Sequence, residues 1–343
     1  AAAEAVFARI QNSAASIIEV ERTKKKESPR LPYSLSSLQI EAGSKYGYSP
    51  ESVLKTMQSL YEKKYTSYPR SDCDYLPENQ LADAGKIISN LRGIFTDGLF
   101  ASGLAKADTG RKSRAWNDKK ISAHHAIIPT IIKCSLDELS TEERNLYEMV
   151  AKAYCAQFLP DHEYMATKII LVADNEKFKA TGKEILVNGW KDLFDNKQED
   201  DSLPALPKVN KGEEVHFKSG AVESRKTVPP KRYTEATLLR TMKEIHKYVR
   251  NPDLKGKLKS VSGLGTEATR ASIISELQKR SFLKKEKKAI VPTDIANTII
   301  GILPEIITYP DTTAIWEDLL GRIADNELPV AKFMEAQNLH SHK

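Results

Sequence analysis

The sequence predicts a multidomain α+β protein in which helical segments flank a β-rich segment. Its 343 residues are enough for two or three domains with separate hydrophobic cores. Between Met165 and Trp190, apolar and polar residues alternate as they do in half-buried strands, whereas the chain on either side shows helical spacing. The hydrophobic content of 40% and the charged content of 29% are ordinary for a globular protein.

The composition argues against a membrane protein and against a disulfide-rich secreted protein. No apolar run approaches the roughly 20 residues that a membrane helix needs, and the N-terminus lacks the basic start and cleavage-site pattern of a signal peptide. The three cysteines, Cys73, Cys134 and Cys155, are an odd, scattered set that fits a reducing compartment and offers no Cys-x-x-Cys pair for zinc. We therefore expect a cytoplasmic protein without membrane contact.

The first part of the chain combines helices with one strand. Apolar spacing predicts a helix over residues 4–15, and alternation predicts a strand over residues 16–23. A short helix over residues 37–42 should be followed by a longer one that Ser49 caps and Pro50 begins, because proline suits the first helical turn. The predicted buried face of the longer helix is Val53, Leu54, Met57, Leu60 and Tyr61.

The middle of the chain changes from helix to strand. Residues 79–105 are expected to be helical, and Ser140 with Glu143 forms the capping-box pattern that begins another helix. The predicted strands cover residues 168–173, 177–182, 214–217 and 219–226. The polar residues Asp174 and Asn175 indicate a hairpin turn between the first two strands.

The last third is predicted to be helical and basic. The expected helices cover residues 234–246, 269–278 and 314–325, and a basic hairpin is expected over residues 284–290. A helix followed by a basic hairpin is the order of a winged helix. Residues 225–290 contain 18 Lys and Arg against 6 Asp and Glu, although the whole chain has a net charge of only +6. This uneven distribution indicates a local surface for a polyanion.

The stretch from Lys64 to Asp72 is the candidate reactive site. Pro69 fixes its own φ and biases Tyr68 toward an extended conformation, so the preceding helix should end before Tyr68. A tyrosine just past a helix end, close to Arg70, can attack or hold a phosphate, because a guanidinium donates two parallel hydrogen bonds to phosphate oxygens. A tight turn with a half-buried aromatic ring is the alternative that these residues alone leave open.

Three motifs connect this stretch to the rest of the chain. They are Tyr68-Pro69-Arg70-Ser71-Asp72 with Tyr75-Leu76-Pro77, Ala-His-His-Ala-Ile-Ile-Pro-Thr at 123–130, and Gly-Leu-Gly-Thr-Glu-Ala-Thr-Arg at 263–270, preceded by Arg-Tyr-Thr-Glu-Ala at 232–236. In this order they resemble the motifs of type IA DNA topoisomerases, in the form carried by the bacterial topoisomerase III branch. The resemblance covers nearly the whole chain.

The resemblance implies an isomerase that cuts single-stranded DNA, passes a strand and rejoins the cut, thereby relaxing or decatenating DNA. Tyr68 would be the nucleophile and would hold the DNA as a transient 5′-phosphotyrosine. A protonated phenol is a poor nucleophile, so Arg70 would favour the phenolate and the charge that develops on the phosphodiester. His124 would donate a hydrogen bond or move a proton near the scissile phosphate. His125 is expected to be structural or peripheral.

The resemblance also implies a path for single-stranded DNA in the basic last third. The residues that match the family's DNA-binding motifs are Arg232, Tyr233, Thr234, Glu235, Thr266, Thr269 and Arg270. Threonine hydroxyls and helix-start amides can meet phosphates, and Tyr233 could stack on a base. Residues 284–288 are either a solvated wing tip or a phosphate contact.

By resemblance the fold is a type IA topoisomerase arch, with winged-helix-like helical domains and a β-rich hinge domain. The β-rich arch domain would comprise residues 1–30 and 161–228, the tyrosine domain residues 31–160, and the winged-helix-like DNA-binding domain residues 229–343. The two crossings at Ser28–Pro32 and Asp161–Tyr164 would be hinges.

The resemblance also bears on the metal and on the partners. The family holds Mg²⁺ with a Glu and an Asp-x-Asp cluster of a Toprim domain, and we find no such cluster in this sequence. Asp72 and Asp74 have no third ligand nearby, so we expect no metal site of the chain's own. We expect a monomeric fragment, inactive alone, that acts on negatively supercoiled or catenated DNA together with the Toprim domain of the full-length enzyme.

Two alternatives belong to other classes. A non-catalytic module that binds single-stranded DNA would lack the acidic cluster, as this sequence does. A tyrosine recombinase would need several dispersed Arg and His partners ahead of a late tyrosine, whereas Tyr68 comes early with Arg70 beside it. The recombinase is therefore disfavoured.

Overall fold

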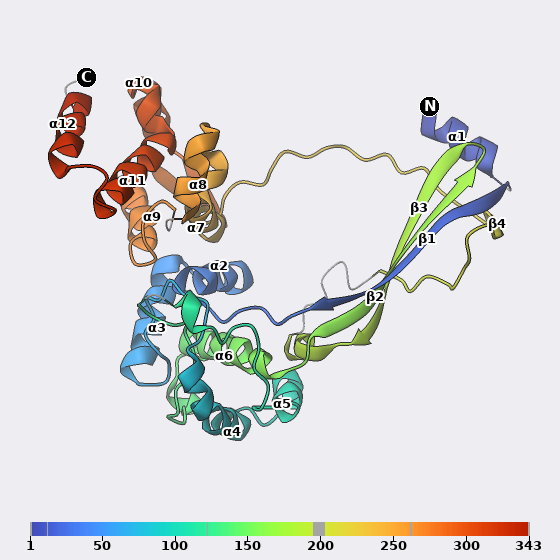
Figure 1. Ribbon diagram of the computed structural model, residues 1–343, viewed down its shortest axis with the longest axis horizontal. Helices are drawn as coiled ribbons and strands as arrows, with labels where there is room; N and C mark the ends of the chain where they lie inside the picture. Colours follow the sequence, from blue (N-terminus) through green and yellow to red (C-terminus); the bar gives the residue numbers. More distant parts are fainter. Residues whose placement is uncertain (1, 12, 122, 195–202, 261–262, 342–343) are drawn as a thin grey trace.

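The computed structural model describes residues 2–11, 13–121, 123–194, 203–260 and 263–341. Within these ranges the chain forms three bodies (Figure 1). We call them the arm (residues 2–30, 162–187 and 203–217), the tyrosine lobe (residues 31–161 and 188–194) and the C-terminal lobe (residues 234–341). The two lobes lie side by side, and the arm projects away from the tyrosine lobe. The α+β class is confirmed.

The arm is an antiparallel sheet with the strand order β3-β2-β1-β4. Its elements are α1 (Ala2–Ile10), β1 (Ala14–Glu27), β2 (His162–Ala173), β3 (Glu176–Val187) and β4 (Glu214–His216). Asp174 and Asn175 both have positive φ, 46° and 63°, as a two-residue hairpin turn requires. A small core of Ile10, Ala15 and Ala173 closes the far end of the sheet.

Two expectations for the arm need correction. The helix predicted over residues 4–15 ends at Ile10, and the strand after it is longer than predicted. The strand predicted over residues 219–226 is wrong: residues 218–233, all described by the structure, are exposed and without regular structure. This connection leaves the sheet after β4 and crosses to the C-terminal lobe without pairing with a strand of the described chain (Figure 1).

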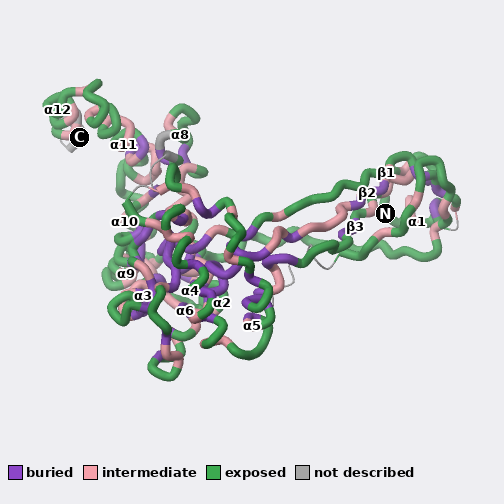
Figure 2. The backbone as a smooth tube through the Cα atoms, turned by 60° about the horizontal axis from the view of Figure 1, so that its bottom comes forward, coloured by how far each residue is buried: buried purple, intermediate pink, exposed green. Residues whose placement is uncertain are grey.

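The tyrosine lobe holds the largest core of the described chain. Its elements are α2 (Leu35–Tyr46), α3 (Pro50–Glu62), η1 (Glu78–Asp83), α4 (Ala84–Ile94), α5 (Gly98–Ala105), η2 (Asp118–Lys120), η3 (Leu136–Glu138), α6 (Thr141–Cys155), η4 (Ala156–Phe158) and η5 (Gly189–Leu193). Figure 2 shows the buried residues gathered in this lobe, whereas much of the arm is exposed. Residues 79–105 are helical as predicted, in the three elements η1, α4 and α5, with a break near Phe95.

Local signals placed α3 and α6 correctly. The Ser49 side chain accepts from the Ser52 amide, and Pro50 occupies the first turn. Val53, Met57 and Leu60 are fully buried as predicted, but Tyr61 is 40% exposed and is not part of the core. That exposure leaves the Tyr61 ring free to face residues 64–76, which follow α3.

The base of the arm is anchored in the tyrosine lobe. Trp190 and Leu193 of η5 belong to the core of that lobe. The Trp190 indole donates to the Glu27 carbonyl at 2.9 Å, which ties the end of β1 to the chain that follows β3. Gly189 has φ of 60°, and a Cβ there would lie 2.4 Å from the Asp161 carbonyl oxygen. The predicted domain limits stay a prediction.

The C-terminal lobe begins with a helix that its own sequence caps. The elements are α7 (Glu235–Lys243), η7 (Ile245–Tyr248), α8 (Pro252–Ser260), α9 (Arg270–Lys279), β5 (Leu283–Glu286), β6 (Ala289–Pro292), α10 (Asp294–Ile302), η8 (Glu305–Thr308), α11 (Asp311–Ala324) and α12 (Val330–Ser341). Thr234 and Thr237 form a reciprocal cap at α7. The basic hairpin follows α9 as predicted; whether the lobe is a winged helix stays a prediction.

The two lobes meet mainly where α2 lies against α7. A Cβ built at Gly43 would lie only 2.7 Å from the Ala236 Cβ, so glycine allows this close approach of the helices. Ile40 packs against the C-terminal core of Leu239, Met242, Ile274 and Ile290. Ser275 Oγ donates to Glu51 Oε2 at 2.9 Å, which joins α9 to α3.

Glu143 gives the tyrosine lobe a pH-dependent stability. Burial disfavours the charged carboxyl, but hydrogen bonds from Lys63, the Ser140 amide and Ser59 outweigh burial and lower the pKa of Glu143 from 4.5 to about 2. The folded-state pKa lies below the unfolded one, so the stabilisation is present above about pH 4.5 and lost as the pH falls through about 2.

Glu143→Gln should therefore lower the melting temperature at pH 7 and should differ progressively less from the wild type as the pH approaches 2. Thermal unfolding followed by circular dichroism across this pH range measures the difference. A difference between the two melting temperatures that stays constant from pH 6 to pH 2 would contradict the assignment.

Candidate active site

The tyrosine segment, residues 64–76, begins at a sharp end of α3. The helix stops at Glu62, and Lys64 adopts a positive φ of 63° that turns the chain back. Thr130 stabilises this turn, because its Oγ1 donates to the Lys64 carbonyl at 2.5 Å and its amide donates to the Tyr65 carbonyl at 3.1 Å. The helix thus ends before Tyr68, as predicted.

Ser67 fastens the tyrosine segment to the second motif. Its amide donates to the Ile128 carbonyl at 2.9 Å, and its Oγ accepts from the Ile128 amide at 3.0 Å. The same hydroxyl donates to the Ala126 carbonyl at 3.2 Å. These bonds place Tyr68, the next residue, beside the histidine pair at 124–125.

The Tyr68 ring lies between two aromatic neighbours. Its centroid is 4.6 Å from that of His124, with the planes 27° apart, and 5.8 Å from that of Tyr61, which approaches edge-on at 83°. The Tyr68 side chain nevertheless remains accessible, with 36% of the residue exposed. The structure therefore orients the ring while leaving the phenol open to a ligand.

Tyr61 is a site neighbour that the sequence interpretation missed. The helical stripe suggested a core residue, because Tyr61 follows Leu60 and Met57 on one face of α3. A residue on the apolar face of the last helical turn before a chain reversal can pack against the reversed segment instead of the core. This position is the signal that could have identified Tyr61.

Arg70 is exposed on a rigid support. Pro69 and Ser71 on either side of it are buried. The Ser71 carbonyl accepts from the Leu35 amide at 2.9 Å, and the Ser71 hydroxyl accepts from the Cys73 amide at 3.1 Å. Among the described residues, Arg70 has no ion-pair or hydrogen-bond partner. Its guanidinium is therefore available to an anion.

His125 is held differently from His124. Its Nδ1 lies 2.8 Å from the Ala126 carbonyl and its Nε2 lies 3.0 Å from Gln80 Nε2. Burial lowers the pKa of His125, which favours the neutral ring. A neutral ring that donates from Nδ1 and accepts at Nε2 satisfies both contacts. This arrangement supports a structural part for His125.

The acidic side chains of the segment do not suit a metal ion. Asp74 Oδ1 already accepts from the Ser34 amide at 2.8 Å and from Ser37 Oγ at 3.2 Å, so it supports the start of α2. Asp72 is exposed. Over the part of the chain that the structure describes, no group of three or more His, Cys, Asp or Glu side chains is placed to hold a metal ion.

The predicted DNA-binding motif at residues 232–236 spans the end of the connection and the start of the C-terminal lobe. Arg232 is exposed in the connection, and Tyr233 is 40% exposed with its hydroxyl 3.1 Å from that of Tyr248. Thr234 caps α7. Glu235 accepts from Gln278 at 2.9 Å, so its carboxylate is committed to α9.

The third motif forms the turn before α9. Thr269 Oγ1 accepts from the Thr266 amide at 2.8 Å, and the two hydroxyls lie 3.1 Å apart. Both threonines are exposed, whereas Glu267 between them is buried. The loop therefore presents hydroxyls outward and a carboxylate inward.

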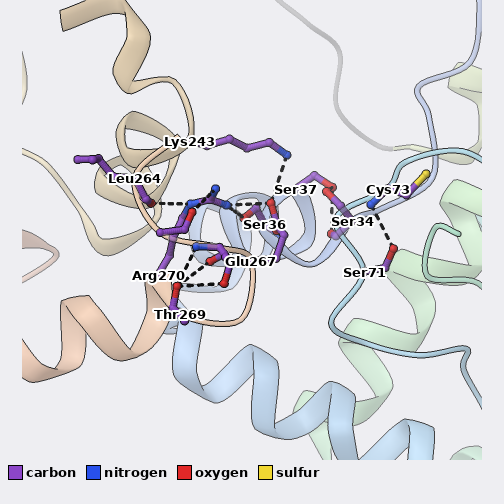
Figure 3. A network of polar contacts seen from close by, with 12 residues as sticks. Ser34, Ser36, Ser37, Ser71, Cys73, Lys243, Leu264, Glu267, Thr269 and Arg270 are labelled. Carbon is purple, nitrogen blue, oxygen red and sulfur yellow. Dashed lines mark hydrogen bonds and ion pairs between the residues drawn. The ribbon is translucent and has the colours of Figure 1, made fainter. Parts of the chain in front are cut away.

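Arg270 requires a correction. It is fully buried, and Figure 3 shows it pointing into the contact between the two lobes. Its guanidinium donates to Glu267 at 2.8 Å, to Ser36 Oγ at 2.9 Å and to the carbonyls of Leu264 and Gly265. A direct phosphate contact by Arg270 is incompatible with this arrangement. The sequence did not reveal it because Ser36 lies 234 residues away.

Comparison with known proteins identifies the family. The family model described as DNA topoisomerase matches residues 1–335. The chain belongs to the DNA topoisomerase family. It is 42% identical to DNA topoisomerase 3 of Haemophilus influenzae over 339 residues, which are 98% of this chain and 52% of that protein. The resemblance to the topoisomerase III branch is thereby confirmed.

Other relatives agree on the family and on the extent of the match. DNA topoisomerase 3 of Vibrio cholerae is 40% identical, with 96% of this chain and 51% of the relative covered. That of Bacillus subtilis is 32% identical, with 97% and 47% covered. The topoisomerase chain thus spans about half the length of the curated relatives it matches.

A solved structure supports the fold. Full-length topoisomerase I from Thermotoga maritima superimposes with a TM-score of 0.72 at 22% identity, over 98% of this chain and 54% of that one. The similarity shows that the fold is that of type IA topoisomerases. None of the helices in the described ranges has the length and apolar character needed to span a bilayer.

Proposed function

We propose that this topoisomerase chain carries the nucleophile and the DNA-guiding surface of an enzyme that cleaves, passes and rejoins single-stranded DNA. The observation that carries the proposal is the accessible Tyr68 ring stacked on His124, with the guanidinium of Arg70, which has no partner among the described residues, two residues away. Because the chain belongs to the DNA topoisomerase family, we propose DNA as the substrate of this site.

In the proposed reaction, the Tyr68 oxygen attacks a backbone phosphorus. A bond forms between that oxygen and phosphorus, the bond from phosphorus to the 3′ oxygen breaks, and the 5′-phosphate stays on the protein. The phenolic proton is lost, and the departing 3′ oxygen gains one. We propose that His124 accepts or donates a proton and that Arg70 stabilises the charge on the phosphate oxygens. Religation is the reverse, because the phosphotyrosine ester conserves the bond.

Mg²⁺ enters the proposal through another domain. Asp74 is committed to the start of α2, so the acidic residues beside Tyr68 do not fit the ion. We propose that a Toprim domain of the full-length enzyme binds Mg²⁺, which would supply positive charge near the phosphate. The chain would then act on negatively supercoiled or catenated DNA as part of a monomeric enzyme.

We propose the domain division given by the resemblance, with residues 1–30 and 161–228 as the arch, residues 31–160 carrying Tyr68 and residues 229–343 guiding DNA. The distinct hydrophobic cores of the two lobes support this division, although Trp190 joins the core of the tyrosine lobe. Cys73, Cys134 and Cys155 are free thiols, which fits the reducing cytoplasm that we propose as the location.

An adduct experiment separates catalysis from simple binding. The chain is incubated with single-stranded DNA and Mg²⁺, with and without a separately supplied Toprim domain, and then resolved on a denaturing gel. A 5′-phosphotyrosine keeps the downstream DNA on the protein, so a 3′-end label should migrate with the protein and a 5′-end label should not. We expect the adduct only when the Toprim domain is present. The absence of any adduct under both conditions would favour a non-catalytic DNA-binding module.

Tyr233→Ala should weaken binding to single-stranded DNA. The exposed ring can stack on a base, and stacking contributes about 1 to 3 kcal/mol per base. Fluorescence anisotropy with a labelled oligothymidine measures the affinity. Tyr233→Phe keeps the ring and loses the hydroxyl, which contacts Tyr248 and Thr241 and not a base, so it should bind like the wild type. Equal affinities for the Ala and Phe variants would remove Tyr233 from the DNA path.

A further inference from the structure

A carboxylate of the C-terminal lobe caps a helix of the tyrosine lobe. Glu267 Oε2 accepts from the Ser36 amide in the first turn of α2 at 2.6 Å. Arg270 Nη1 donates both to Glu267 at 2.8 Å and to Ser36 Oγ at 2.9 Å, and Lys243 Nζ lies 3.8 Å from the same carboxylate (Figure 3). The first turn of α2 is thus held from outside its own lobe.

The other side of that turn is bonded to the tyrosine segment. The Leu35 amide donates to the Ser71 carbonyl at 2.9 Å, and the Ser34 amide donates to Asp74 Oδ1 at 2.8 Å. Ser71 is only three residues after Tyr68 and is fully buried. The first turn of α2 therefore lies between Glu267 and the segment that carries Tyr68.

Burial makes these contacts hard to replace. Ser34, Ser36 and Arg270 are fully buried and Glu267 is 5% exposed, so water cannot readily substitute for a lost partner. The Ser34 side chain, at the N-cap position, does not accept from an amide of α2. Glu267 satisfies one of the amides that a helix start leaves without a partner. Losing its carboxylate charge would loosen the first turn.

We propose that Glu267 is a positioning residue for Tyr68. It fixes the first turn of α2, and through that turn the backbone of Ser71 to Asp74, so that docking of the C-terminal lobe sets the position of the tyrosine segment. Thr266 and Thr269 flank Glu267 on the exposed side of the same loop. The proposal rests on the proposed function in taking Tyr68 as the nucleophile.

Amide hydrogen exchange on the 343-residue chain tests the coupling. Glu267→Gln should accelerate exchange by about tenfold in peptides covering residues 34–38 and in those covering residues 66–76. The matched control is Glu276→Gln, which removes the same charge from an exposed ion pair with Arg280 on α9 and should leave both regions unchanged. If exchange accelerates only over residues 263–272, the loss of the Glu267 charge acts locally and does not reach residues 66–76. That result would overturn the proposal.

A milder variant keeps the test decisive if Glu267→Gln disturbs the whole C-terminal lobe. Ser36→Ala removes one of the acceptors of Arg270 and retains the Ser36 amide, so the same two regions should exchange faster by a smaller factor. Unchanged exchange over residues 66–76 in Ser36→Ala would then overturn the proposal. The readout needs no DNA and no cleavage, so a failure of the coupling is distinguishable from a failure of Tyr68 as nucleophile in the adduct experiment.

Discussion

Tyr68→Phe should abolish adduct formation and leave DNA binding nearly intact. Phenylalanine keeps the ring that stacks on His124 at 4.6 Å and loses only the oxygen that would attack phosphorus. Removing a covalent nucleophile lowers catalysis by at least about 10⁴-fold. The measurement is the rate of 3′-labelled adduct formation in the presence of the Toprim domain, alongside oligonucleotide affinity by anisotropy.

The DNA affinity and the rate of adduct formation of Tyr68→Phe test different parts of the assignment. An affinity within about tenfold of the wild type would show that the variant retains its DNA path, because losing a hydrogen bond costs about 0.5 to 1.5 kcal/mol. A 3′-labelled adduct formed by Tyr68→Phe at an undiminished rate would rule out Tyr68 as the nucleophile. Tyr61→Phe is the matched control, since it removes a hydroxyl from the neighbouring ring and should still form the adduct.

Arg270→Met should destabilise the contact between the lobes by about 3 to 5 kcal/mol. That is the usual cost of leaving one charge of a buried pair without its partner, and here it would leave Glu267 without its 2.8 Å ion pair. Urea unfolding followed by circular dichroism measures the loss as a lower transition midpoint. Arg270→Lys should recover little, because one ammonium group cannot reach the separate acceptors that the guanidinium serves.

The control for Arg270 lies on the same helix. Arg280 pairs with Glu276 at 2.7 Å, but both side chains are more than half exposed. Arg280→Met should therefore change the stability by less than about 1 kcal/mol, as solvent-exposed ion pairs do. Similar losses of unfolding free energy in the two variants would mean that the buried pair of Arg270 stabilises the fold no more than an exposed ion pair does.

Elements with local signals were predictable from the sequence. Ser49 with Pro50 begins α3, Ser140 with Glu143 begins α6 and Thr234 begins α7, because a capping residue and its partners lie within one turn of each other. The hairpin at Asp174-Asn175 was predictable for the same reason. The tyrosine segment was also recognisable, because its motif is continuous in the chain.

Features that depend on distant segments were not predictable in this way. Arg270 has the residue type of a phosphate contact, and only the docking of α2 shows that it is buried. Tyr61 has the spacing of a core residue, and only the reversal at Lys64 brings Tyr68 beside it. Residues 219–226 have strand-like composition, but they pair with no strand of the described chain. In each case tertiary contact overrides a local pattern.

The exposed connection of residues 218–233 limits how far the C-terminal lobe can travel. Fully extended, this segment spans no more than roughly 55 Å. If the C-terminal lobe leaves α2, the tether keeps it at an effective concentration in the millimolar range, as short linkers do. Re-docking is then a unimolecular event, independent of the concentration of the protein. Lengthening the connection with glycine and serine would lower the effective concentration of the C-terminal lobe at α2. Re-docking would then be slower although no contact between the lobes had changed.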